Sequence, residues 1–96
     1  MLDTNKDWLP LGSVVSIKGG DRLVMVIGFM AIDGNTKAVW DYVCCPYPEG
    51  KRSAEDLFIN RESVDEVFQL GLRDAEGLAF EEYLESLEED LKNQAK

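Results

Sequence analysis

Apolar and polar side chains alternate along the first half of the chain with the two-residue period of β-strands. The alternation covers residues 13–18, 23–32 and 37–45. Gly19-Gly20-Asp21 separates the first two of these stretches and Asp33-Gly34 separates the last two, and both sequences are typical of tight hairpin turns. We therefore expect three consecutive strands that pair in an antiparallel manner.

The second of these strands is apolar on both faces. One face carries Leu23, Met25, Ile27 and Phe29, and the other carries Val24, Val26 and Gly28. Such a strand is expected either to be covered on both sides or to curl around the core. Gly28 suits the sharp bend or bulge that small barrels use at a corner.

Two shorter strands are predicted after Gly50, at residues 57–59 and 64–72, and a single helical turn capped by Asn60 is expected between them. Glu66 and Phe68 fall on the same face of the second stretch, which conflicts with a buried side. We therefore expect Val67 or a bulge to change the direction in which this strand points its side chains.

The apolar period changes to that of an α-helix from Asp74 onward, and Asp74 itself is a suitable N-cap. The apolar positions at helical spacing are Phe80, Tyr83, Leu84, Leu87 and Leu91. Because many carboxylates lie between them and repel one another, this helix needs a docked apolar stripe. The stripe packs either on the domain's own sheet or, in part, on the helix of another protein.

These elements predict an α+β, mainly β fold, in which a five-stranded antiparallel sheet precedes an acidic C-terminal helix. The sheet is expected to form an SH3-like or partly open small barrel, and an open meander with the helix on one face is the alternative. The 96 residues suit a single domain. Within it, we expect a mobile N-terminus at residues 1–7, the sheet at 8–73 and the helix at 74–93.

The chain is strongly acidic, with 10 basic and 19 acidic side chains and a net charge of −9. Residues 74–96 hold eight of the acids and two of the bases. This charge disfavours nucleic acid and anionic membranes as partners. The sequence has neither an apolar run of about 20 residues nor the pattern of a signal peptide, so we expect a cytoplasmic protein.

Few residues in the sequence suit catalysis or metal binding. No histidine is present, so neither a Ser-His nor a Cys-His pair can form. Cys44 and Cys45 are adjacent in a strand and point to opposite faces, which suits neither a mutual disulfide nor a structural zinc site. We therefore expect no metal, no cofactor and no enzymatic activity. Asp41 occupies either an outward position or that of a hydrogen-bond acceptor in a partner-binding groove.

A rigid aromatic turn at the end of the third strand is the best candidate for a protein-binding surface. The predicted partner-binding residues are Trp40, Tyr42, Pro46, Tyr47, Pro48 and Glu49, together with Tyr83 and Leu87 on the helix. Core packing is the competing explanation for Trp40 and Tyr42. Tyr47 lies between two prolines and is expected to be exposed.

Several motifs together resemble the domain of unknown function 4176 family. The matching segments are residues 9–15, 18–20, 23–28, 41–43, 46–50, 58–60 and 64–67, of which the Tyr-Pro-Glu-Gly segment at 47–50 is the most distinctive. The family occurs in Gram-positive bacteria, commonly beside type VII secretion clusters that encode WXG-like helical partners and LXG-type toxins. It supplies no catalytic residues to transfer to this sequence.

This resemblance implies a cytosolic accessory or chaperone-like adaptor that binds an exported LXG-type toxin or its helical targeting partners. An immunity-type or regulatory protein, which would bind a toxin domain through its acidic face, is the alternative. Both hypotheses require a protein partner, and a homodimer is compatible with either.

Overall fold

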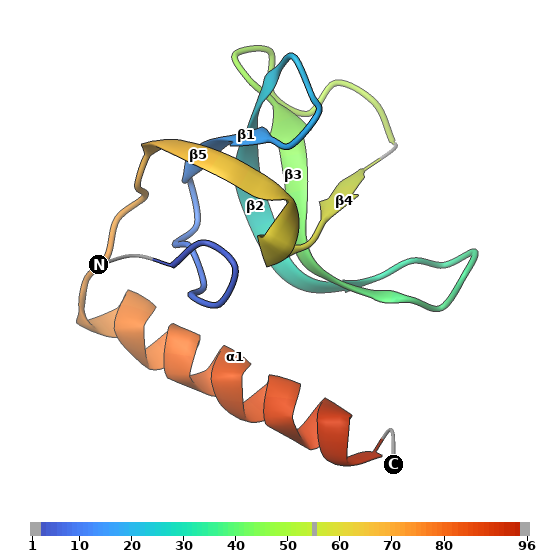
Figure 1. Ribbon diagram of the computed structural model, residues 1–96, viewed down its shortest axis with the longest axis vertical. Coiled ribbons are helices and arrows are strands. Elements are labelled where there is room, and N and C mark those ends of the chain that lie inside the picture. The colour runs from blue at the N-terminus through green and yellow to red at the C-terminus, as the bar shows by residue number, and fades with distance from the viewer. Residues whose placement is uncertain (1–2, 55, 95–96) are drawn as a thin grey trace.

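The computed structural model describes residues 3–54 and 56–94. Its elements are β1 (Val14–Ile17), β2 (Leu23–Ile32), β3 (Val39–Pro46), β4 (Leu57–Ile59), the single-turn helix η1 (Arg61–Ser63), β5 (Val64–Gln69) and α1 (Ala75–Gln94). The strands form one open antiparallel sheet in the order β4-β3-β2-β1-β5. Figure 1 shows α1 crossing one end of this curled sheet, while the β2–β3 hairpin projects to the side. The predicted α+β, mainly β fold is confirmed.

A β-bulge in β2 determines which of its side chains enter the core. Val26 pairs with Cys44 and Gly28 pairs with Val43, so Ile27 is an extra residue and the bulge predicted at Gly28 is confirmed. The bulge reverses the alternation beyond it and places Phe29 opposite Tyr42, on the core side. The prediction that Phe29 shares a face with Met25 is therefore wrong.

The core forms around Trp8, which comes from the segment before β1 and is only 1% exposed. Its ring makes edge-to-face contacts with Phe29 and Tyr42, at centroid distances of 6.2 and 5.6 Å. Leu9 is fully buried beside it, and its N–H donates a hydrogen bond of 2.8 Å to the Tyr42 hydroxyl. This bond satisfies two polar groups that the core would otherwise leave unpaired.

The strand β5 is shorter than predicted and is bulged. Its pairing with β1 shifts register twice, and Val67 is packed against the core, so the predicted change of direction is confirmed. The chain then passes very close to the segment before β1 at Gly71, where a Cβ atom would lie 2.0 Å from the Leu11 carbonyl oxygen. The Gly71 N–H also donates to Ser13 Oγ at 3.0 Å, which fixes where the chain leaves the sheet.

The helix α1 docks on the sheet of its own domain. Leu84 is 1% exposed within the core, and the rings of Phe80 and Phe29 lie 5.5 Å apart. Asp74 caps the helix as predicted, because its Oδ1 accepts a hydrogen bond of 2.8 Å from the Gly77 N–H. Within the described residues, no helix has both the length and the apolar character that a membrane span requires.

Candidate functional site

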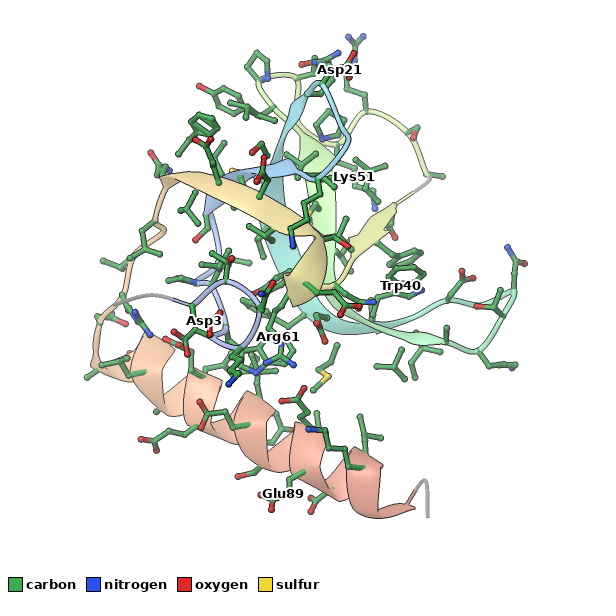
Figure 2. The ribbon with its side chains drawn as sticks, viewed as in Figure 1. Asp3, Asp21, Trp40, Lys51, Arg61 and Glu89 are labelled. Carbon is green, nitrogen blue, oxygen red and sulfur yellow. The ribbon has the colours of Figure 1, made fainter. Side chains whose placement is uncertain are left out.

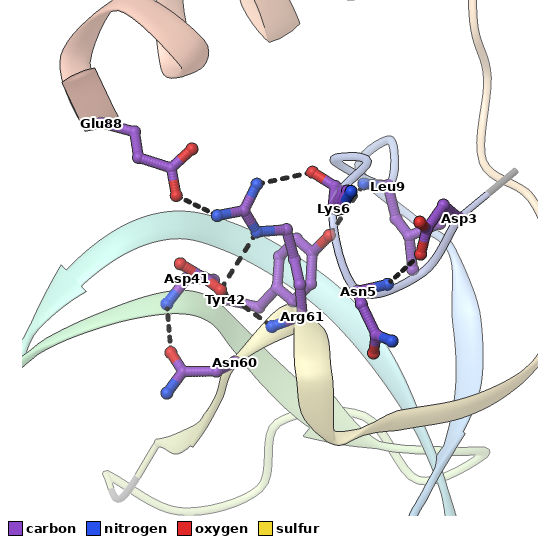
Figure 3. A network of polar contacts seen from close by, with 9 residues as sticks. All are labelled: Asp3, Asn5, Lys6, Leu9, Asp41, Tyr42, Asn60, Arg61 and Glu88. Atoms are coloured by element: carbon purple, nitrogen blue, oxygen red, sulfur yellow. Dashed lines mark hydrogen bonds and ion pairs between the residues drawn. The ribbon is translucent and has the colours of Figure 1, made fainter.

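Arg61 joins four separate parts of the chain at the place where α1 meets the sheet (Figure 3). Its Nε donates to Asp41 on β3 at 3.2 Å, one terminal nitrogen donates to the Lys6 carbonyl at 2.7 Å, and the other donates to Glu88 on α1. The guanidinium also lies 4.2 Å from the centre of the Trp8 ring. This arrangement ties the N-terminal turn, β3, η1 and α1 together.

The surroundings of Arg61 keep it charged despite its burial. Burial alone would lower the pKa of Arg61, but its hydrogen bonds and charge attraction to Glu88 and Asp41 outweigh this effect, and the net shift is upward. Both carboxylates are therefore occupied by an internal cation. These contacts hold parts of the fold together and do not form an open binding site.

Asp41 and Asn60 have roles that differ from the predicted ones. Asp41 accepts hydrogen bonds from the backbone and side chain of Arg61, so it is neither outward-facing nor available to a partner. The predicted helical turn after Asn60 is present as η1, but the Asn60 side chain does not cap it. It accepts a hydrogen bond of 3.0 Å from the Asp41 N–H instead, because β4 ends at Ile59, opposite Tyr42, and does not pair with Asp41.

Burial in the core raises the pKa of two ionisable groups, Cys44 and Tyr42, and so favours their neutral forms. Burial raises the pKa of the Cys44 thiol from its ordinary value of 9.0 to about 12, with a smaller contribution from Cys45. Burial likewise raises the pKa of Tyr42, more than its bond with Leu9 lowers it. Cys44 and Cys45 are both buried free thiols. A protonated, buried thiol is a weak nucleophile.

We expect the domain to lose stability as the pH rises above about 9. The folded chain keeps the Cys44 proton up to a pKa of about 12, whereas the unfolded thiol releases it near 9.0, so alkaline pH favours the unfolded state. The contribution of this group is at most about 1.4 kcal/mol per pH unit. Urea unfolding between about pH 8 and 11 would measure it. A Cys44→Ala variant should lose less stability over this range, and an equal loss would contradict the assignment.

Three hollows that share lining residues follow one another from the outer face of the sheet to its junction with α1, and we call them together the outer groove. The first hollow has a volume of about 250 Å³ and lies between Tyr47 and Phe68. It shares Met25 with a second hollow of about 320 Å³. The second shares Leu11 and Ile27 with a third, of about 330 Å³, which reaches α1. The outer groove therefore extends from the turn after β3 to the first half of α1.

Large apolar side chains are exposed along the outer groove. The exposed fractions are 58% for Leu11, 47% for Tyr47, 57% for Phe68, 79% for Leu72 and 45% for Phe80. These side chains come from four separate segments of the chain. An exposed apolar surface of this kind, gathered outside the core, is typical of interaction sites.

The predicted partner-binding turn lies at one end of this groove. Tyr47 lines the first hollow, and Pro48 and Glu49 beside it are exposed. The peptide bond between Tyr47 and Pro48 is cis. Arg22 donates hydrogen bonds to the Glu49 carboxylate and thereby lowers the pKa of Glu49. Pro46 is the last residue of β3 and is half-buried.

The other predicted residues do not join Tyr47. Tyr42 lies in the core with no exposed surface, because the centre of the sheet covers it, so its predicted place on a contact surface is corrected. The Trp40 ring stacks on the ring of Phe58 in β4, with 6.3 Å between the two ring centres. Figure 2 shows Trp40 beside β4. Tyr83 is 57% exposed on α1, and Leu87 is partly covered there. Figure 1 shows that α1 lies at the opposite end of the sheet from the turn after β3.

Sequence reasoning missed the middle of the outer groove. The strand at residues 23–32 is expected either to be covered on both sides or to curl around the core, and its pattern does not indicate that Met25 and Ile27 lie beside Leu11. The available signal was the apolar outer face of residues 23–27, which has no second sheet to cover it. Within the described residues, no group of three or more acidic or cysteine side chains is placed to hold a metal ion.

Taken together, the fold and the groove define a small, mainly β domain with a docked acidic helix and an exposed apolar surface. The family described as Domain of unknown function (DUF4176) matches residues 8–80, and the chain belongs to this family. The resemblance inferred from the motifs is thus confirmed. Neither a curated protein nor a solved structure matches the chain.

Proposed function

We propose that this protein is a cytoplasmic, non-enzymatic accessory or chaperone-like adaptor in type VII secretion. In this role it binds an exported LXG-type toxin or the helical proteins that target the toxin for export. The assignment to this system rests on the resemblance of the sequence motifs. The assignment to protein binding rests on the outer groove.

The observation that carries the proposal is the exposure of apolar side chains in the outer groove. The core already has its own cluster around Trp8, so Leu11, Phe68 and Leu72 are left outside it. Burying such side chains against a partner yields about 25 cal/mol for each Å² removed from water. An adaptor that shields an exported protein before secretion would use a surface of this kind.

The non-enzymatic part of the proposal is supported by the state of the most reactive groups. Burial holds Cys44 in its protonated form, and Arg61 engages the half-buried carboxylates of Asp41 and Glu88. General acid–base or nucleophilic chemistry needs such groups to be accessible and suitably ionised. Turnover of a small molecule by the purified chain would contradict the proposal.

We expect Tyr47→Ala to weaken the complex with the toxin without unfolding the domain, because Tyr47 is 47% exposed and forms one wall of the groove. The loss should be about 1–2 kcal/mol, or roughly tenfold in affinity. Pull-down and titration with the N-terminal helical region of a neighbouring LXG toxin would measure it. Val39→Ala is the matched control, since Val39 is 43% exposed at the first position of β3, at the opposite end of the strand from Tyr47. Equal binding by both variants would argue against the groove.

The alternative function, an immunity-type or regulatory protein, is favoured by the acidic face of α1. Glu82, Glu85, Glu89 and Asp90 are all exposed there, and Figure 2 shows Glu89 pointing away from the sheet. In this role the chain would bind the C-terminal domain of the toxin, and its affinity for that domain would fall by more than about tenfold at high salt. The adaptor would bind the N-terminal region and lose only a few-fold, because apolar contacts dominate.

A further inference from the structure

The floor of the outer groove restricts how a partner chain can bind there. Residues 23–26 of β2 are paired with β3 on one side and with β1 or the segment before it on the other: Met25 pairs with Val14 and Cys45, and the Val26 N–H donates to the Ser13 carbonyl. The backbone groups of this strand are therefore already used. A bound segment cannot join the sheet as an extra strand here and must be held through its side chains.

A helix satisfies this requirement, because it pairs its own backbone groups and presents apolar side chains at i, i+3, i+4 and i+7. Residues 23–27 of β2 span about 13 Å at the rise of a strand, a length that about nine helical residues match. The groove continues beyond Ile27 to Leu72 and Phe80, which adds room for a further turn.

The charges around the groove select against an acidic occupant. The two arginines at its ends are each paired with a glutamate, Arg22 with Glu49 and Arg73 with Glu81. Glu66 on β5 and Glu76 in the first turn of α1 are exposed on the elements that supply Phe68 and Phe80 to the groove, and residues 74–92 hold eight acids and one base. A second copy of this chain would bring the same excess of negative charge, so like charges oppose self-association at this face.

We propose that the outer groove binds an amphipathic helix whose apolar stripe is flanked by lysine or arginine. This inference rests on the proposed function, for which it specifies the partner's chemistry at the same site. The apolar stripe packs on Leu11, Met25 and Ile27, and the basic flanks lie near the acids of α1 and β5. The charges then add specificity to a contact whose affinity is mainly apolar.

Designed 18-residue peptides would test this inference with the full chain. The first peptide has a leucine stripe flanked by lysines. The second has glutamates in place of the lysines, and the third has the composition of the first in scrambled order. The fourth is the first peptide with a proline at its centre. We expect the first to bind with saturation and the others to bind at least about tenfold more weakly at low salt. Equal binding of the scrambled, glutamate or proline peptide would overturn the claims of a stripe, of basic flanks or of a helix, respectively.

Two matched variants locate the contact. Leu11→Ser and Ile32→Ser each remove one aliphatic side chain, and these side chains are similarly exposed, at 58% and 64%. Leu11 lines the groove, whereas Ile32 lies at the far end of β2. We expect only Leu11→Ser to weaken binding of the lysine peptide, by about fivefold to tenfold, with unfolding by urea as the check on folding. An equal effect of both variants would overturn the assignment to the groove.

The toxin pull-down and the peptide titration, taken together, separate this inference from the proposed function. If the toxin region co-purifies with the chain but the lysine peptide does not bind, the adaptor proposal stands and the helix in the groove is wrong. If the peptide binds in the groove but neither toxin region co-purifies, the inference stands and the link to toxin export is wrong.

Discussion

Replacing Arg61 with alanine should destabilise the domain by about 3–5 kcal/mol, the largest effect expected of any single substitution here. The Arg61 side chain is 11% exposed, and its loss leaves Asp41 and Glu88 as half-buried carboxylates without their cation. It also removes the donor to the Lys6 carbonyl and the cation above Trp8. For a domain of this size, the melting temperature should fall by about 15–30 °C.

Thermal and urea unfolding of purified protein would measure this loss. Arg22→Ala is the matched control, because the Arg22 side chain is 57% exposed and its ion pair with Glu49 lies in solvent. That variant should change stability by less than about 1 kcal/mol. Arg61→Lys keeps the charge but cannot reach three partners with a planar fork, so it should recover only part of the loss. If Arg61→Ala loses no more stability than Arg22→Ala, the contacts of Arg61 do not hold the fold together.

Leu84→Ala should cost about 2–5 kcal/mol and should loosen α1 from the sheet. Leu84 is 1% exposed, and it is the α1 side chain that enters the core cluster. Its truncation leaves a cavity beside the core and removes most of the apolar anchor of an acidic helix that is not stable alone. Urea unfolding would measure the loss, and amide hydrogen exchange in α1 would detect the loosening.

The matched control for this substitution is Tyr83→Ala, the neighbouring position, which is 57% exposed. That variant should change the free energy of unfolding by less than about 1 kcal/mol. Protection of α1 amides that stays the same in Leu84→Ala would mean that Leu84 is not needed to hold the helix. In that case the contact of Phe80 with Phe29 and the ion pair of Arg61 with Glu88 would dock it.

Local patterns in the sequence predicted most of the fold. Strand periods, the hairpin turns, the helical period after Asp74 and the bulge at Gly28 each depend on residues that are neighbours in the chain. The side on which Phe29 lies could not be predicted, because Gly28 suits either a bend or a bulge, and only a bulge before Phe29 reverses the side on which it lies. That choice is made by the pairing of β2 with β3, which a single strand does not encode.

The candidate surface was only partly predictable for the same reason. Tyr47 was identified because its flanking prolines force it into an exposed turn. Leu11, Met25 and Phe68 line neighbouring hollows although they come from three distant segments, and no spacing in the sequence indicates this. Arg61 was missed entirely, because its partners are 20, 27 and 55 positions away along the chain. An isolated arginine after a short strand carries no signal of such a network.

The contacts of Arg61 also bear on where the domain can be cut. The family match stops at residue 80, yet Leu84 and Glu88 come after that point. A polypeptide trimmed to the matched region would keep every described strand, but its core would lack Leu84 and the Arg61 guanidinium would lack one of its two carboxylate partners. We expect that such a fragment would be hard to express as a folded species, so biochemical work on this protein should use a polypeptide that includes at least the first four turns of α1.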